Sequence, residues 1–173
     1  MSGKRNWTGF AWMLAALFAA GATQAWSEDG KAVTVSANGQ AVLSLQLPAG
    51  GSAKPALGAT VIAVPSQGLS FEVWTVADAK AIADAIPRVA DVIKPVFLGF
   101  KPSATNDLTI AGAPAKHLLS SGTEADDGDP GKAEVVLFAV GGRVFAASAH
   151  GEGDYASLHR KAMLDVLATA KAP

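Results

Sequence analysis

Alternation of apolar and polar residues predicts short β-strands over the first half of the chain. Residues 32–47 form two predicted strands joined at Asn38-Gly39, a dipeptide that favours a tight hairpin because both positions tolerate positive φ. Two further strands are predicted at residues 60–64 and 69–76, with a Pro-Ser-Gln-Gly turn between them. Residues 48–58 are rich in Gly and Pro, which predicts a loop between the two pairs.

The second half of the chain also predicts strands, at residues 97–100, 106–112, 115–122, 134–140 and 143–150. Ala113-Pro114 separates the second and third of these, and Gly141-Gly142 predicts a two-residue hairpin between the last two. Residues 135–140 are apolar at every position, which is typical of a central strand covered on both sides.

Helical periodicity is confined to two places. Apolar residues recur at helical spacing between residues 77 and 94, but Pro87 lacks an amide hydrogen, so we expect two helices at 77–85 and 87–94 or one kinked helix. A last helix is predicted over residues 155–171, with Asp154 as its N-cap.

This order of elements predicts an α+β fold, an antiparallel β-sheet with helices packed on both faces in an α/β/α sandwich. Three segments carry a resemblance: LSLQLPAGG (43–51), the hairpin LTIAGAPAKHL (108–118), and the strand, turn, strand and helix of residues 135–171. In this order they resemble the PsbP-like fold family. The resemblance implies the same sandwich and a non-enzymatic accessory role, with no shared catalytic residues.

The N-terminus has the pattern of a secretory signal peptide. Lys4 and Arg5 precede an uncharged, mostly apolar stretch at residues 7–21, and small residues follow. We predict a signal peptide at residues 1–25 with cleavage after Ala25, and cleavage after Ala22 is the alternative. A retained anchor is the other reading, but the apolar stretch is shorter than the roughly 20 residues that a membrane span needs.

The remaining residues, 26–173, have the size of a single domain. Loss of Lys4 and Arg5 lowers the net charge by two, from −1 to −3, so phosphate-driven nucleic-acid binding has no support. The chain has no Cys, which excludes disulfides and thiolate chemistry. An exported protein held together by core packing alone suits the periplasm, so we expect a periplasmic or secreted protein with no stable membrane anchor after cleavage.

Histidines and carboxylates near the last helix are the candidate metal ligands. His150, Glu152, Asp154 and His159 lie close in sequence, and a zinc ion would require three or four such side chains to converge. Their spacing matches no known metal motif. The favoured alternative is a buried His159 bonded to a backbone carbonyl, because polar groups in a core are hydrogen-bonded.

An acidic run at residues 123–131 is the other candidate site. It holds Glu124, Asp126, Asp127 and Asp129, whose oxygens suit calcium, but the alternating order of an EF-hand is missing. The run is therefore interpreted as a solvated hairpin tip.

No catalytic motif is recognisable. The chain has no Gly-x-Ser-x-Gly sequence and no Lys-containing phosphate loop, so we assign no catalytic residues and no cofactor. Trp74 is interpreted as packing against a helix, with a partner surface as the alternative.

The sequence predicts an exported accessory or binding protein without enzymatic activity, whose partner is another envelope protein. The alternative is a small-ligand or metal-binding protein that uses the region of His150 and His159.

Overall fold

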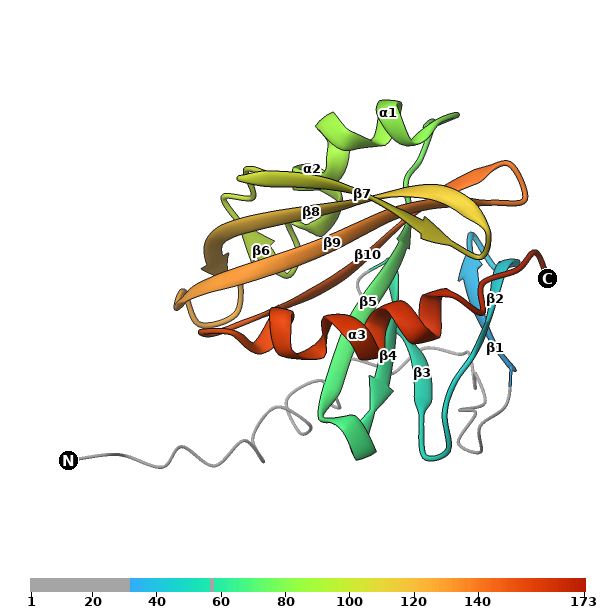
Figure 1. Cartoon of the computed structure of the whole chain (residues 1–173), viewed down its shortest axis with the longest axis horizontal. Helices are drawn as coiled ribbons and strands as arrows, with labels where there is room; N and C mark the ends of the chain where they lie inside the picture. The colour runs from blue at the N-terminus through green and yellow to red at the C-terminus, as the bar shows by residue number, and fades with distance from the viewer. Residues whose placement is uncertain (1–31, 57) are drawn as a thin grey trace.

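The computed structural model describes residues 32–56 and 58–173, and their chain is mostly β-structure (Figure 1). The strands are β1 (Ala32–Ala37), β2 (Gln40–Gln46), β3 (Ser52–Ala56), β4 (Ala59–Val64), β5 (Leu69–Thr75), β6 (Phe97–Leu98), β7 (Ala104–Ile110), β8 (Ala113–Glu124), β9 (Pro130–Val140) and β10 (Arg143–Gly151). The helical segments are η3 (Pro65–Gln67), α1 (Ile82–Ala85), η4 (Ile86–Arg88), α2 (Val89–Ile93) and α3 (Tyr155–Leu167).

One antiparallel sheet contains most of the strands. Its order is β3-β4-β5-β10-β9-β8-β6, and β7 also pairs with β8. Strands β1 and β2 form a separate two-stranded ribbon. The predicted signal peptide, its cleavage positions and Trp26 lie outside the described residues. Within the described part, no helix is long and apolar enough to cross a bilayer.

The prediction of an α/β/α sandwich with helices on both faces is wrong. Strands account for 52% and helices for 20% of the structure, and the sheet curls into a half-barrel. One face carries the single long helix α3 beside the β1–β2 ribbon. The other carries only α1, η4 and α2, turns of four, three and five residues, because Pro87 ends any longer helix there.

Both sequence-predicted tight hairpins are confirmed. Ala37 pairs with Gln40 across Asn38 (φ 51°) and Gly39 (φ 75°). Val140 pairs with Arg143 across two glycines that also have positive φ. These turn residues fix the register of the strands that follow them.

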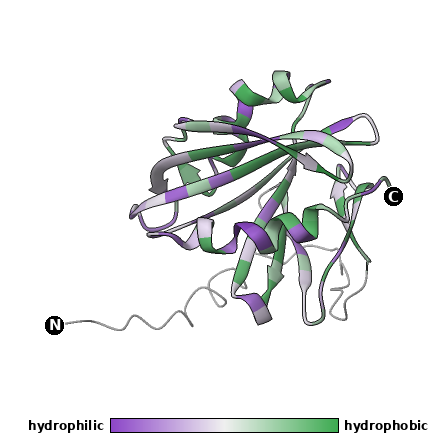
Figure 2. Ribbon diagram, viewed as in Figure 1, coloured by the Kyte–Doolittle hydropathy of each residue, from purple (hydrophilic) through white to green (hydrophobic). Residues whose placement is uncertain are grey.

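The central strands are buried on both faces, as their sequence predicts. Val135, Val136 and Leu137 are fully buried, although they point alternately to opposite sides of β9. Phe138 and Phe145 are cross-strand partners and stack with ring centroids 5.5 Å apart on the α3 face. Figure 2 shows hydrophobic residues along these strands and hydrophilic residues recurring along α3.

Several predicted element boundaries were wrong. The predicted loop at residues 48–58 contains strand β3, which accommodates Pro55 because it lies at the edge of the sheet. Strand β8 begins at Ala113, because the turn after β7 falls on Ala111-Gly112, both with positive φ, and not on Ala113-Pro114. Trp74 is 5% exposed and packs into the core under α1 and α2, as its favoured interpretation requires.

The predicted helix starts were also imperfect. The segment expected at residue 77 becomes helical only at Ile82, because Val76 still pairs with Val144 beyond the end of β5 and Asp78 has positive φ. Helix α3 starts at Tyr155 as predicted but ends at Leu167. The Asp154 side chain does not cap it and instead pairs with Lys132, at 2.8 Å.

Candidate functional site

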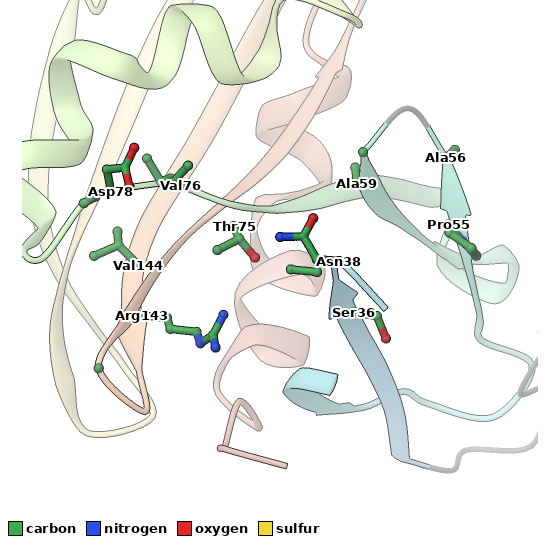
Figure 3. A pocket seen from close by; sticks show the side chains of 15 residues that line it. Ser36, Asn38, Pro55, Ala56, Ala59, Thr75, Val76, Asp78, Arg143 and Val144 are labelled. Carbon is green, nitrogen blue, oxygen red and sulfur yellow. The ribbon is translucent and has the colours of Figure 1, made fainter. Parts of the chain in front are cut away.

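The principal candidate site is an open depression at one end of the sheet, with a volume of about 720 Å³ (Figure 3). Four chain segments meet there: the β1–β2 turn, the β3–β4 turn, the chain leaving β5, and the β9–β10 turn. We call it the turn depression. Its described lining residues are Ser36, Ala37, Asn38, Pro55, Ala56, Gly58, Ala59, Thr75, Val76, Ala77, Asp78, Ala79, Gly142, Arg143 and Val144.

Local backbone geometry shapes the turn depression. Asn38 and Asp78 both have positive φ (51° and 57°), a conformation that Asn and Asp adopt more readily than most residues with a side chain. This backbone conformation lets the chain turn tightly at both positions. The N–H of Val76 donates to the carbonyl of Val144 at 2.9 Å and thereby fixes the chain leaving β5 against the start of β10.

The turn depression carries one cation and one anion. Arg143 is the first residue of β10, and Asp78 follows β5. Both side chains are exposed, and neither makes an ion pair or a side-chain hydrogen bond within the part of the chain that the structure describes. Small residues provide most of the remaining surface, so a ligand can reach the backbone.

A second group of functional interest is buried at the other end of β10. His150 Nδ1 lies 2.6 Å from Glu124 Oε2, and His150 Nε2 lies 3.4 Å from Glu72 Oε2. The three side chains, which we call the His150 cluster, are 11–14% exposed.

The charge state of the His150 cluster follows from these contacts. Burial opposes protonation of the imidazole, but the hydrogen bond to Glu124, the ionic contact with Glu72 and the charges of both carboxylates outweigh it and raise the pKa of His150 to about 10. His150 is therefore an imidazolium at neutral pH and holds strands β5 and β8 against β10.

Polar atoms line the neighbouring part of β5 and β10. Ser148 pairs with Glu72, and Ala146 with Trp74, so these side chains follow one another on the α1–α2 face. Three buried atoms of these strands, Glu72 Oε2, Ser148 Oγ and Trp74 Nε1, and Oε1 of the neighbouring Glu124 on β8 have no hydrogen-bond partner in residues 32–56 and 58–173, although Glu72 Oε2 lies 3.4 Å from His150 Nε2. Because buried polar groups are normally paired, this seam is an unusual feature of an otherwise apolar core.

A separate ion cluster lies on the opposite, α3 face. Arg160 donates from Nε and Nη2 to the two oxygens of Glu134, each at 2.6 Å, and His117 Nε2 lies 2.9 Å from Glu134 Oε2. Burial would raise the pKa of Glu134, but the bonds from Arg160 and then His117 lower it to about 2. This Glu134 cluster attaches α3 to β8 and β9.

The predicted metal candidates do not converge. His150 faces the α1–α2 side of the sheet, whereas His159 packs on the α3 side with its ring centroid 4.5 Å from that of Tyr155. Asp154 pairs with Lys132, and Glu152 is exposed. No group of three potential ligands that could hold a metal ion exists among the described residues. The predicted backbone hydrogen bond of a buried His159 was also wrong, because His159 is half-buried and makes no such bond to a described residue.

The acidic run is divided by the structure. Asp126 and Asp127 are exposed at the turn between β8 and β9, in agreement with a solvated tip. Glu124 was misassigned to that tip, because it is the buried last residue of β8 and pairs with His150. Sequence reasoning also missed Glu72, Glu134 and Arg160, although a lone Glu within each apolar strand was an available signal.

Comparisons with known proteins show no matching family model and no matching curated protein. The chain is similar in structure to PA94, a protein of unknown function from Pseudomonas aeruginosa, with a TM-score of 0.45, 16% identity, and coverage of 81% of this chain and 96% of that one. It is also similar to LpqN, which is involved in cell envelope biogenesis of Mycobacterium tuberculosis, with a TM-score of 0.44, 17% identity, and coverage of 81% and 90%. Likeness at this level carries no conclusion about function.

Proposed function

We propose that this chain is an exported, non-enzymatic accessory protein that binds another protein of the cell envelope through the turn depression. The observation that carries the proposal is the depression itself, an open site of about 720 Å³ formed by three turns and the chain leaving β5 at one end of the sheet. Binding sites are commonly concave and lie on loops that a rigid scaffold positions.

The lining of the turn depression favours binding over catalysis. Its described side chains include two hydroxyls, one amide, one carboxylate and one guanidinium, without a histidine beside either hydroxyl. The paired histidines, His117 and His150, belong to ion clusters elsewhere in the sheet. Export is supported by the signal-peptide pattern of residues 1–25.

Site-specific photocrosslinking in living cells tests the proposed binding surface. A benzophenone amino acid is introduced at Ala77 or Pro55, which are exposed positions of the turn depression. The matched control is Leu158, which is 76% exposed on α3, outside the depression. We expect one discrete crosslinked protein from both depression positions and none from Leu158. Crosslinks from Leu158 alone, or no crosslink from either depression position, would contradict the proposal.

A further inference from the structure

Three hydrogen-bond donors extend toward the same region of the turn depression (Figure 3). The carboxamide of Asn38 and the hydroxyl of Thr75 face each other, and the guanidinium of Arg143 extends toward them from the start of β10. Asp78, the single acidic residue among the described lining residues, lies to one side of this group and makes no ion pair with Arg143.

The three donors come from different segments whose positions the backbone fixes. Asn38 occupies the tight β1–β2 turn, and Thr75 is the last residue of β5 and pairs with Phe145. Arg143 pairs with Val140 across the β9–β10 turn. Because these pairings place the donors around one space, binding there does not require the backbone to rearrange.

The charge of Arg143 is not neutralised by the rest of the described chain. A guanidinium remains protonated at all physiological pH values, and its planar donors match the two oxygens of a carboxylate. Such charge-assisted pairs are about twice as strong as neutral hydrogen bonds. The Asn38 amide and the Thr75 hydroxyl can donate to the same anion, which distinguishes this position from an isolated surface arginine.

We propose that the turn depression binds a carboxylate group, with Arg143 as its charged anchor and Asn38 and Thr75 as additional donors. The inference rests on the proposed function and names the ligand class of that site. Two sources share this chemistry, namely the free C-terminus of a protein partner and a small organic acid. The volume of about 720 Å³ accommodates several residues of a chain end.

NMR titration of the mature protein at low ionic strength tests the proposal. The probes are succinate, trialanine with a free carboxyl group, and the same tripeptide with an amidated C-terminus. We expect a free carboxylate to shift the amide resonances of residues 36–38, 75–79 and 142–144, and the amidated peptide to bind at least tenfold more weakly. A response to trialanine identifies a chain end as the source, and a response to succinate alone identifies a small acid.

Variants at Arg143 give the decisive comparison. Arg143→Gln should weaken carboxylate binding about tenfold or more, and Arg143→Lys should retain part of it because the charge remains. Lys94→Gln removes an exposed positive charge outside the depression and should leave binding unchanged. Equal binding of the free and amidated peptides, or an Arg143→Gln protein that binds like the wild type, would overturn the proposal.

The two proposals fail in different ways. If Ala77 and Pro55 give crosslinks but no free carboxylate shifts the NMR resonances, the binding surface is supported and the carboxylate is not its ligand. If succinate shifts the resonances but no protein is crosslinked, the carboxylate site is supported and the proposed binding of an envelope protein is wrong.

Discussion

His150 lies between two carboxylates that its neighbours in the sequence do not indicate. The chain around it is apolar on one side and Gly-rich on the other, yet two carboxylates from β5 and β8 flank its ring. A charge buried in this way is stable only while its partners stay ionised and close, since an unpaired buried charge is costly. The His150 cluster therefore makes the stability of the sheet sensitive to pH.

The first prediction concerns this pH dependence. The pKa of His150 is raised from 6.5 to about 10, so its stabilising contribution is complete below pH 6.5 and is lost as the pH rises toward 10. His150→Gln should lower the free energy of unfolding by about 3 kcal/mol at pH 6.5, because it leaves two buried carboxylates without their cation. Urea denaturation at pH 6.5 and pH 10 should show the difference between the two proteins shrinking at the higher pH.

His159→Gln is the matched control for this measurement. His159 is half-buried on the α3 face and has no carboxylate partner in the described chain. Its replacement should leave the difference in stability between the two pH values as in the wild type. A wild-type protein and a His150→Gln variant that lose equal stability between pH 6.5 and 10 would contradict the assignment.

The second prediction concerns Gly131, which faces the carboxyl group of Glu124. A Cβ atom at Gly131 would lie 2.6 Å from Glu124 Oε1 and 3.2 Å from the carbonyl of Gly151. Gly131→Ala should therefore displace Glu124 from His150 and cost about 1–3 kcal/mol. Chemical denaturation in a double-mutant cycle with Glu124→Ala measures the coupling, and an equal cost in both backgrounds would show that Glu124 is not the group displaced.

At the scale of elements, α3 is attached to the sheet by two kinds of contact. Met163, Val166 and Leu167 pack against the core of the α3 face, and Arg160 reaches Glu134 on β9. The apolar contacts bury hydrophobic surface without fixing the position of the helix. The bidentate bond to Glu134 defines where along the strand the helix lies. Helical periodicity predicted the apolar face, but the ionic contact joins residues 26 positions apart.

The third prediction tests the ionic attachment of α3. Arg160→Met keeps much of the side-chain volume but leaves the carboxylate of Glu134, which is 3% exposed, without its main partner. We expect a loss of about 3 kcal/mol at pH 7, measured by urea denaturation. Lys161→Met, which removes an exposed pair with Asp165, should change stability by no more than about 0.5 kcal/mol.

Acid should reduce the effect of Arg160→Met. The pKa of Glu134 is lowered from 4.5 to about 2, so its contribution is complete above pH 4.5 and is lost as the pH falls toward 2. The stability difference between Arg160→Met and the wild type should therefore shrink between pH 5 and pH 2. A stability difference that stays constant over this range would show that ionisation of the Glu134 carboxylate is not its source.

At the scale of the whole molecule, the curled sheet separates three polar regions. The turn depression lies at the start of β10, and the His150 cluster lies seven residues further along the strand, roughly 23 Å away at the usual rise of an extended chain. The Glu134 cluster occupies the opposite face of the sheet. This separation allows the ion clusters to stabilise the fold while the turn depression stays accessible to a ligand.

The fourth prediction concerns export of the whole chain. Expressed in a Gram-negative host, the protein should be recovered from the periplasm with Trp26 as its first residue, or Thr23 if cleavage follows Ala22. Intact-mass spectrometry of the purified protein measures this directly. Leu14→Arg, which places a charge in the apolar stretch, should retain the uncleaved chain in the cytoplasm. Recovery of a wild-type protein that still carries its N-terminal 25 residues would contradict the prediction.

Features that depend on neighbouring residues could be predicted from the chain alone. The turns at Asn38-Gly39 and Gly141-Gly142, the doubly buried strand after residue 134 and the start of the last helix all follow from local pattern, because turn conformation and side-chain period are properties of short segments.

Tertiary structure alone decided which distant side chains meet. It curled the sheet into a half-barrel, paired His150 with Glu124 across 26 positions, and brought three turns and the chain leaving β5 together around Arg143. These outcomes depend on strand order, register and sheet twist, which arise from long-range packing and leave no local signal in the chain.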